Sequence, residues 1–299
     1  MPMQPVALAV RSRLRIAWVV LALMGACVVG VRAEIKVSPW RAAFQGVELA
    51  DGTADASEPR MQKMFAARIR LDSPGLKFFG TPRAGGRETV GETASAFLTR
   101  HRLQLAINAN FYEPVSNSPV EINIEGLAVS QREVVSPPSP GLPALCLTED
   151  NRVRIVETTP ANFSTAGIHT AIAGSRIILR EGRPIARASA PDDVHPRTAV
   201  GLSRDGRTLI WLVIDGRQTS YSLGATVEET AQWLARLGAH EGLMLDGGGS
   251  TTLVRADREG RATLLNRPIH KNTPGQERLN GNHLGLRAAP LPLSIPVQK

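Results

Sequence analysis

The segment over 208–246 constrains the fold most, because it combines the patterns of a strand, a helix and a second strand in direct succession. Residues 208–214 are almost wholly apolar and rich in β-branched side chains, which predicts a strand buried on both faces. Thr226 precedes Glu229 by three residues, which is the spacing of a capping box at the start of a helix. We therefore expect a well-defined helix to follow this buried strand.

A second short strand is predicted over 242–245, after Gly238, which is placed to end the helix in the left-handed conformation. The connection between the two strands is long enough for a parallel crossover. Asp246 would then lie at the carboxyl end of a strand, where α/β sheets bind ligands. Other patterns predict strands over 35–49, 65–71 and 103–107 and a helix over 93–100. We expect an α+β or mixed α/β fold, a single domain with mixed β-sheets flanked by helices.

The first 33 residues carry the pattern of a secretory signal. Arginines at positions 11, 13 and 15 precede an apolar run over 16–31, and small residues at positions 31 and 33 predict cleavage before Glu34. The run is shorter than the roughly 20 residues needed to cross a bilayer, which favours a cleaved signal. An uncleaved membrane anchor and a lipoprotein site at Cys27 are the alternatives.

Cleavage would give an exported protein, periplasmic or extracellular, with no stable membrane insertion. It would leave a domain over 34–290 and a C-terminal tail over 291–299. Cys146 would be the only thiol of the mature chain, so no intramolecular disulfide can form. Its place in the apolar run 144–147 favours a buried core cysteine over a nucleophile.

The formal net charge of +8 is compatible with nucleic acid, an anionic membrane surface or an anionic substrate. Four of the arginines lie in the first 33 residues, which contain no acidic residue, so the remainder carries about half of this excess. Aromatic residues make up only 4% of the chain, which argues against the stacking platforms that bind single-stranded nucleic acid. We therefore expect an anionic glycan or glycosyl phosphate as partner, and no nucleic acid.

The densest chemical signal is a run of three glycines, Gly247, Gly248 and Gly249, between Asp246 and the hydroxyl residues over 250–252. Successive glycines cost backbone entropy, but they allow backbone to approach a ligand closely and amide groups to converge on an anion. A tight turn, the alternative interpretation, needs only one or two. The run lacks the lysine of a P-loop and the spacing of a dinucleotide-binding fingerprint.

Two further clusters carry polar side chains. Asn108 and Asn110 follow the predicted strand 103–107, where they would either hydrogen-bond sugar hydroxyls or cap turns. Arg197 precedes another apolar run, and its guanidinium matches phosphate, although such a residue is also common on surfaces. The dispersed histidines show no H-E-x-x-H spacing and the chain has no G-x-S-x-G elbow, so we predict no metal and no cofactor.

In combination, these segments resemble the phosphodiester glycosidase family. The resemblance rests on residues 108–112, 126–136, 197–201, 205–206, 213–217, 222–226, 229, 237–239, 245–251 and 266–282. It covers roughly 45–287. Ala109 stands in place of a glycine common in that family, Met244 in place of an asparagine, and 121–125 has no family equivalent.

The resemblance implies hydrolysis of a sugar-1-phosphodiester at the anomeric C–O bond, which releases the sugar and a phosphomonoester. Such a reaction passes through an oxocarbenium-like state that is normally served by two carboxylates. A phosphate leaving group is weakly basic and needs little proton donation. Neutralising its charge therefore matters more.

On this hypothesis Asp246 is the nucleophile or the base for water, and Arg197 clamps the phosphate with the amides of Gly247 to Gly249. Asp215 is a second carboxylate, acting as acid/base or orienting Arg197, unless it serves only as a turn residue. Substrate contacts are expected from Asn108, Asn110, Ser250, Thr251 and Arg278. The alternatives are a metal-dependent phosphodiesterase and a non-catalytic envelope module that binds anionic polysaccharide.

Overall fold

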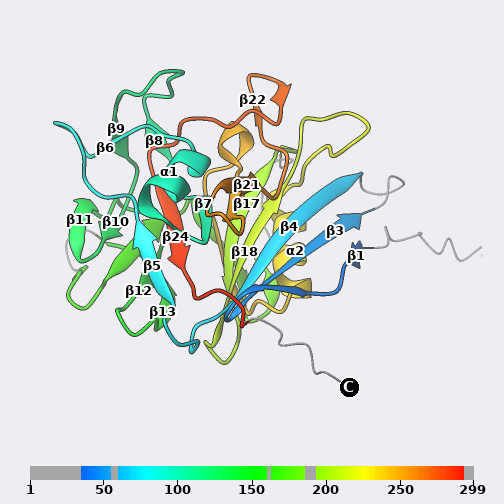
Figure 1. The fold of residues 1–299 in the computed structure, drawn as a ribbon, viewed down its shortest axis with the longest axis horizontal. Coiled ribbons are helices and arrows are strands. Elements are labelled where there is room, and N and C mark those ends of the chain that lie inside the picture. Colours follow the sequence, from blue (N-terminus) through cyan, green and yellow to red (C-terminus); the bar gives the residue numbers. More distant parts are fainter. Residues whose placement is uncertain (1–34, 55–59, 160–162, 186–192, 293–299) are drawn as a thin grey trace, which may run out of the picture. The chain divides into compact units, whose positions relative to one another are not determined.

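The computed structural model describes residues 35–54, 60–159, 163–185 and 193–292. The predicted signal sequence lies outside these residues, as does most of the predicted tail. The largest sheet has nine strands, and every pair of neighbours in it runs antiparallel (Figure 1). In spatial order its strands are β1 (Ile35–Val37), β3 (Val47–Ala54), β4 (Gln62–Arg70), β18 (Thr208–Ile214), β17 (Arg197–Leu202), β19 (Glu241–Met244), β15 (Arg176–Arg180) and β16 (Arg183–Pro184), and β2 (Arg41–Phe44) also pairs with β3.

Two five-stranded antiparallel sheets accompany it. One has the order β21 (Ala262–Leu264), β20 (Leu253–Ala256), β7 (Leu105–Asn108), β24 (His283–Arg287) and β5 (Lys77–Gly80). The other has the order β11 (Glu133–Ser136), β10 (Ala128–Ser130), β14 (Thr170–Ala173), β12 (Ala144–Leu147) and β13 (Val153–Val156). Two small sheets contain β6 (Thr89–Val90), β9 (Glu121–Ile124) and β8 (Tyr112–Glu113), and β22 (Ile269–His270) and β23 (Thr273–Pro274).

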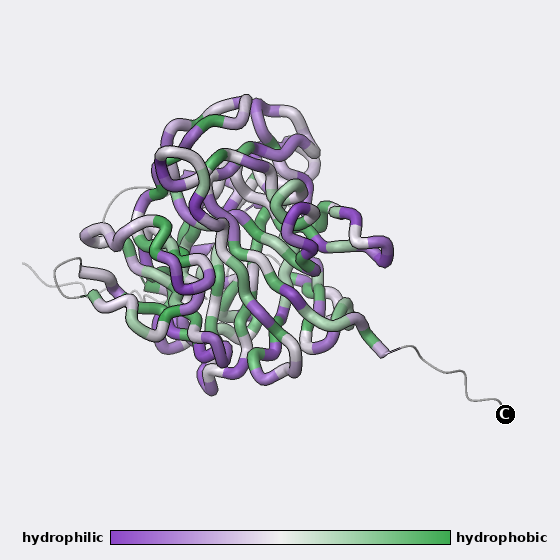
Figure 2. The backbone as a smooth tube through the Cα atoms, turned by 60° about the vertical axis from the view of Figure 1, so that its left-hand side comes forward, coloured by the Kyte–Doolittle hydropathy of each residue, from purple (hydrophilic) through white to green (hydrophobic). Residues whose placement is uncertain are grey.

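The main hydrophobic core lies where these three larger sheets face one another. Trp211 of β18, Ile107 of β7 and Leu145 of β12 are all fully buried in it. Figure 2 shows the same pattern along the backbone, with apolar segments on interior strands and hydrophilic segments at many of the loops. Burial of apolar surface between sheets is the main source of stability in such an arrangement.

Both predicted helices are confirmed. α2 (Val227–Arg236) starts at a complete capping box: the Thr226 hydroxyl accepts from the Glu229 amide, and the Glu229 carboxylate accepts from the Thr226 amide. Gly238 has φ +99, the left-handed conformation expected after the helix. α2 packs on the nine-stranded sheet, and α1 (Ala94–His101) packs on the sheet of β7 and β20. Among the described helices, neither combines the length and the apolar character that a membrane crossing requires.

The predicted α+β or mixed α/β class is wrong. The described residues form sheets joined mostly by turns and contain only two α-helices, so the sheets cover one another rather than being flanked by helices. The crossover from β18 through α2 to β19 does form, but β17 lies between these strands and is antiparallel to both. One strand–helix–strand unit therefore does not make a parallel sheet.

The inserted strand determines what meets at the edge of the sheet. Arg197 opens β17 opposite Ile214, the last residue of β18, while Ala199 pairs with Met244, the last residue of β19. Asp246 therefore follows the carboxyl end of a strand as predicted, although the sheet is antiparallel. Arg197 lies at the same edge because β17 runs in the opposite direction.

Candidate active site

A cavity of about 430 Å³ opens at this edge of the sheet, within the range typical of small-molecule sites. The glycine loop and Asp246 line it. Four arginines line it as well, namely Arg176, Arg197, Arg217 and Arg278. The predicted contacts Arg197 and Arg278 are thus brought together with Asp246, and two arginines join them that the sequence did not single out.

Asp246 is the one acidic side chain among the described residues that line the cavity, and only 8% of it is exposed. Its backbone is held on both sides, since its amide donates to the Ala109 carbonyl at 3.0 Å and its carbonyl accepts from Asn108 Nδ2 at 2.6 Å. Burial raises the pKa of its carboxyl to about 6, against the opposing effects of a hydrogen bond with Ser250 and the charge of Arg278. This carboxylate can therefore change protonation state in the neutral range.

Two of the three glycines make room for guanidinium groups. A Cβ on Gly249 would lie 2.4 Å from Arg278 Nη2, and a Cβ on Gly248 would lie 3.2 Å from Arg217 Nη2. Gly248 also has φ +60, a conformation that strains other residues. The glycine run thus lets two arginines lie directly against the loop that carries Asp246.

The amides of this loop are mostly committed within the protein. The Gly248 amide donates to the Pro196 carbonyl at 2.8 Å, and the Gly247 amide hydrogen-bonds the Asp246 carboxylate. Within the described loop this leaves only the Gly249 amide, among the three, without a protein acceptor. The expected convergence of three amides on a phosphate is therefore not what the glycines provide. The nearby guanidinium groups supply the positive charge instead.

Three of these arginines lack an acidic partner. Arg278 Nε donates to His270 Nδ1 at 3.3 Å and Arg278 Nη1 to Ser250 Oγ at 3.4 Å. Arg217 Nη2 lies 3.2 Å from His195 Nδ1. Within the described part of the chain the side chain of Arg176 makes no hydrogen bond or ion pair, and no carboxylate pairs with Arg217 or Arg278. Unpaired guanidinium groups in a cavity are suited to hold an anion.

Two backbone carbonyls orient Arg197. Its Nε donates to the Ala225 carbonyl at 2.8 Å, and Nη2 donates to the Asp193 carbonyl. Together with Arg217 it lowers the pKa of His195, for which burial is the largest cause. His195 is therefore favoured in its neutral form, and the arginines carry the charge of the cavity.

The sequence profile of the phosphodiester glycosidase family matches residues 101–287, which contain all of these groups. The chain belongs to the phosphodiester glycosidase family. This family comprises hydrolases that act on phosphodiester glycosyl linkages, and the cavity is the place in this glycosidase where a carboxylate and several cationic groups meet. No curated protein sequence matches the chain.

Solved structures share the fold of this glycosidase at low sequence identity. The catalytic domain of zebrafish N-acetylglucosamine-1-phosphodiester alpha-N-acetylglucosaminidase, auto-inhibited by its pro-peptide, is 18% identical with a TM-score of 0.63, over 86% of this chain and 88% of that one. A Burkholderia pseudomallei protein described as exported is 13% identical with a TM-score of 0.61, over 85% and 96%. A hypothetical Synechocystis protein is 14% identical with a TM-score of 0.58, over 81% and 62%.

The two asparagines of the glycosidase's first motif are engaged within the protein. Asn108 Oδ1 accepts from the Thr198 hydroxyl and the Thr252 amide, while its Nδ2 holds the carbonyl of Asp246. Asn110 donates to two backbone carbonyls and accepts from Asn282 Nδ2 and a backbone amide. Both are 1% exposed. Each therefore braces the site, and we place neither in contact with a sugar.

Asp215 also faces the protein rather than the cavity. Its Oδ1 accepts from Asn266 Nδ2 at 2.8 Å, and its Oδ2 accepts from the Arg267 amide at 2.9 Å and the Tyr221 hydroxyl at 3.1 Å. Burial raises the pKa of this carboxyl to about 6, opposed by these hydrogen bonds. Asn266 continues to the Thr251 carbonyl at 3.1 Å, so Asp215 supports the loop from behind.

Ser250 and Thr251 have different hydrogen-bond partners. Ser250 accepts from Arg278 and hydrogen-bonds the Asp246 carboxylate, so it lies between the two charged groups. The Thr251 hydroxyl accepts from Thr198 at 3.3 Å and is 1% exposed. Ser250 therefore belongs to the immediate surroundings of Asp246, whereas Thr251 belongs to the packing beneath it.

Two residues near Asp246 were missed as site residues. The Tyr112 hydroxyl donates to the Leu279 carbonyl at 2.7 Å. Burial, together with the charge of Asp246, raises its pKa to about 12, so it stays a neutral hydroxyl. Glu125 has an exposed side chain close enough for its charge to raise the pKa of Asp246. Its amide donates at 2.8 Å to the carbonyl of Phe111, which lines the cavity. Glu125 thus offers a second carboxylate, from the segment that has no family equivalent.

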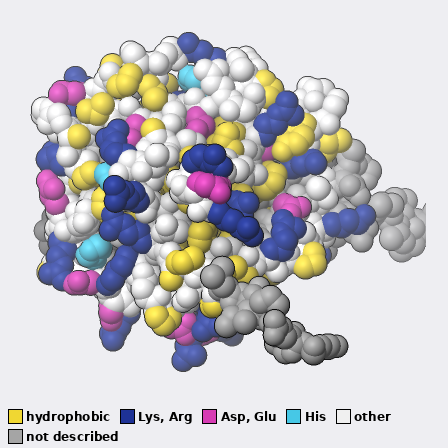
Figure 3. All heavy atoms as spheres, viewed as in Figure 1, with side chains coloured by type: hydrophobic (Ala, Val, Ile, Leu, Met, Phe, Trp, Pro, Cys, Tyr) yellow, Lys and Arg dark blue, Asp and Glu magenta, His cyan; other side chains and the backbone are white. Residues whose placement is uncertain are grey.

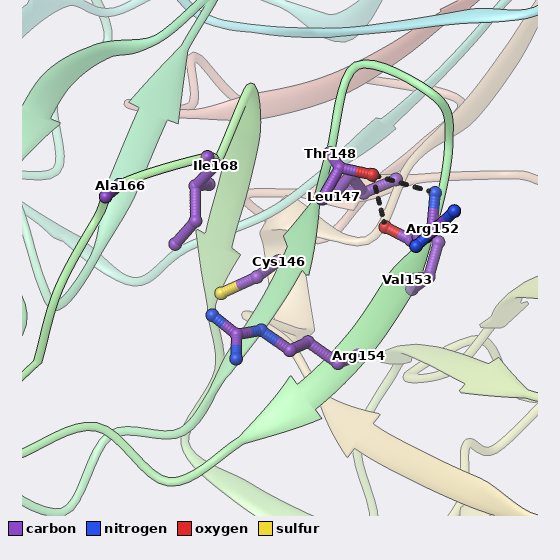
Figure 4. A pocket seen from close by; sticks show the side chains of 9 residues that line it. Cys146, Leu147, Thr148, Arg152, Val153, Arg154, Ala166 and Ile168 are labelled. Atoms are coloured by element: carbon purple, nitrogen blue, oxygen red, sulfur yellow. Dashed lines mark hydrogen bonds between the residues drawn. The ribbon is translucent and has the colours of Figure 1, made fainter.

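A second cavity, of about 280 Å³, lies beside β12 and β13 (Figure 4). Cys146 and the guanidinium of Arg154 point toward one another there. The thiol is 2% exposed, and burial raises its pKa to about 11. Because the thiolate is the reactive form, this cysteine is inert near neutral pH, and the prediction of a buried core cysteine is confirmed.

The described residues contain no group of three or more His, Cys, Asp or Glu side chains arranged to hold a metal ion.

Proposed function

We propose that this protein hydrolyses a sugar-1-phosphodiester at the anomeric C–O bond and releases the sugar and a phosphomonoester. The observation that carries this proposal is a buried carboxylate, Asp246, in one cavity with three arginines that have no acidic partner among the described residues. That pairing suits a reaction in which a cationic sugar centre forms while a phosphate departs.

Each group has a role in this proposal. Asp246 attacks the anomeric carbon or accepts the proton of the attacking water. Arg278 lies across Ser250 from Asp246 and against Gly249, so it neutralises the departing phosphate. Ser250 and the neutral hydroxyl of Tyr112 orient the Asp246 carboxylate.

Glu125 is the second carboxylate in this proposal, in place of Asp215. Its exposed side chain lies near Asp246, so it can exchange a proton with the leaving group or with water. Asp215 becomes a positioning residue, because its carboxylate holds Asn266, the Arg267 amide and Tyr221. Arg197 contributes long-range positive charge from the start of β17.

The deciding experiment asks which bond breaks. The purified full-length protein is incubated in H₂¹⁸O with a methyl phosphodiester of N-acetylglucosamine 1-phosphate, the sugar being chosen from the name of the zebrafish relative. Cleavage at carbon places ¹⁸O in the free sugar. Label in the phosphate, or release of sugar 1-phosphate, would mean P–O cleavage and contradict the proposal.

Two controls accompany this measurement. Asp246→Asn should release no sugar above background, while the same preparation should remain folded by circular dichroism. A parallel reaction with a chelator tests for a metal-dependent phosphodiesterase, which would lose activity. A protein that binds the diester but never turns it over would instead be a binding module.

We also propose that the protein is exported. The basic residues before an apolar run over 16–31 support this, as does the fold shared with a Burkholderia protein described as exported. Mass spectrometry of the periplasmic fraction should find a chain beginning at Glu34. A chain recovered only with membranes and beginning at Met1 would favour the uncleaved anchor.

A further inference from the structure

The charge of the cavity exceeds what a single phosphodiester needs. Four guanidinium groups and the Asp246 carboxylate line it, so three positive charges are in excess when Asp246 is ionised. If Glu125 is counted as a second negative charge, the excess is two positive charges. A phosphodiester carries only one negative charge. Because these like charges face one cavity and repel one another, the bound substrate should supply more than one negative charge.

On the surface of the protein, several arginines are paired with carboxylates. On the face in Figure 3, basic side chains lie among acidic ones. The N–O distance is 2.8 Å in the ion pair Arg261–Asp257 and 2.9 Å in the ion pair Arg152–Asp150. Arg176, Arg217 and Arg278 differ from these surface arginines because no carboxylate pairs with them. What sets these three arginines apart is that they line one cavity together with Asp246.

The arginines also lie at different places around Asp246. Arg278 is joined to Asp246 through Ser250 and lies against Gly249. Arg217 is exposed and lies against Gly248, a different residue of the loop from the one that Arg278 contacts. Arg176 opens β15 on the other side of β19, where it pairs in register with Met244. An anion at Arg278 would leave Arg217 and Arg176 for another anionic group.

On these observations, and resting on the proposed function, we infer that the preferred substrate is a glycosyl phosphodiester whose aglycone carries a second anionic group next to the phosphate, as in a glycosyl diphosphate. Arg278 holds the phosphate attached to the sugar. Arg217 and Arg176 hold the second anionic group and determine specificity. His195, held beside Arg217 at 3.2 Å, fixes the direction of that guanidinium.

The reaction is a hydrolysis and needs no other reactant. The bond between the anomeric carbon and the phosphate oxygen breaks, and its electron pair leaves with the diphosphate ester. The oxygen of water joins the anomeric carbon. One proton of that water is lost, and the departing oxygen either stays ionised or takes up a proton, so atoms and charge balance.

Binding can test this inference without any turnover. Isothermal titration calorimetry at fixed pH and ionic strength compares inorganic pyrophosphate with inorganic phosphate on the full-length protein. We expect pyrophosphate to bind at least about tenfold more tightly, which corresponds to about 1.4 kcal/mol. Arg176→Gln and Arg217→Gln should each reduce this ratio to less than about threefold. Arg180→Gln removes an exposed arginine from the same strand as Arg176 and should keep the wild-type ratio.

The outcomes separate the two proposals. Equal affinities in the wild-type protein, or a pyrophosphate preference that both cavity variants retain, would overturn the inference, whatever the catalytic result. If the preference is present and depends on these arginines, the inference stands as a binding property even if no sugar is released. Where sugar is released, kcat/KM for UDP-N-acetylglucosamine relative to the methyl diester should fall at least about tenfold in Arg176→Gln.

Discussion

Gly249 and Arg278 are in direct contact, because a Cβ at Gly249 would lie only 2.4 Å from Nη2 of the guanidinium. The backbone at Gly249 lies outside the left-handed region, so alanine is compatible with the local conformation. A methyl group at position 249 would therefore displace the flexible end of the Arg278 side chain. Gly249 is thus needed for the position of Arg278 more than for the conformation of the turn.

Gly249→Ala should therefore displace Arg278 with little loss of stability. We expect kcat/KM to fall about 100-fold, as for a misplacement of about 1 Å, while the free energy of unfolding changes by less than about 1 kcal/mol. Kinetics and denaturant unfolding measure both. In an Arg278→Ala background the same substitution should cost almost nothing further. A full additional loss there would show that the glycine acts through another contact.

Asp246→Asn should separate activity from stability. Turnover should fall at least about 10³-fold, because the catalytic carboxylate is lost. The fold should become more stable at pH 8, because burial raises the pKa of Asp246 from its ordinary 3.8 to about 6 in the folded state. Removing a carboxylate that is costly to ionise there relieves up to roughly 3 kcal/mol.

The sign of this effect depends on pH. Below about pH 3 Asp246 is protonated in both the folded and the unfolded state, so the variant gains nothing there. As pH rises toward 6 the unfolded state ionises first, and the stability of the wild type falls relative to the variant. Urea unfolding at pH 4 and pH 8 measures the difference, in which the similar titration of Asp215 cancels. A constant difference across this range would mean that the pKa of Asp246 is not raised.

Activity should show the same titration. As nucleophile or base, Asp246 works only when ionised, so kcat/KM should rise with pH with a midpoint near 6 and reach a plateau above about 7. Values of kcat/KM measured in buffers of constant ionic strength give this rising part of the pH profile. A plateau reached already at pH 4.5 would place the essential carboxylate in a solvated position, unlike the 8% exposure of Asp246.

Local patterns in the sequence were enough to predict the elements that carry the site, but not their pairing. The strand over 208–214, the Thr226 capping box and Gly238 each depend on neighbouring residues, and all three are confirmed. The insertion of β17 between β18 and β19 depends on contacts between distant segments, and no local period encodes it. This is why a parallel crossover was expected in an antiparallel sheet.

The site residues divide in the same way, into those that a local pattern predicts and those that only the fold brings together. Asp246, Arg197 and Arg278 could be named because they stand in dense or characteristic motifs. Arg217 follows an Asp-Gly pair that is typical of turns, and Arg176 begins a strand without any special neighbour. Only the folded sheet brings these two to Asp246. A search for arginines at predicted strand ends would have been the one available signal.

Asp215→Ala should affect stability more than chemistry. It removes the acceptor shared by Tyr221, Asn266 and the Arg267 amide, so we expect a loss of about 3 kcal/mol in unfolding free energy. At a temperature where the variant is fully folded, kcat should remain within about tenfold of wild type. A loss near that of Asp246→Asn with unchanged stability would return Asp215 to the role of second catalytic carboxylate.

Glu125→Gln should show the opposite behaviour. The side chain is exposed, so stability should change by less than about 0.5 kcal/mol, while kcat falls about 100-fold through the loss of an acid/base group. The pH dependence of the remaining activity is a second measurement. The charge of Glu125 raises the pKa of Asp246, so removal of this charge should move the acid limb, the rise of kcat/KM with pH, to lower pH. Glu133→Gln, which changes an exposed carboxylate on β11, is the matched control and should leave both the rate and the limb in place. An unshifted limb with a normal rate in Glu125→Gln would place this carboxylate outside the reaction, and Asp246 would then act with the arginines alone.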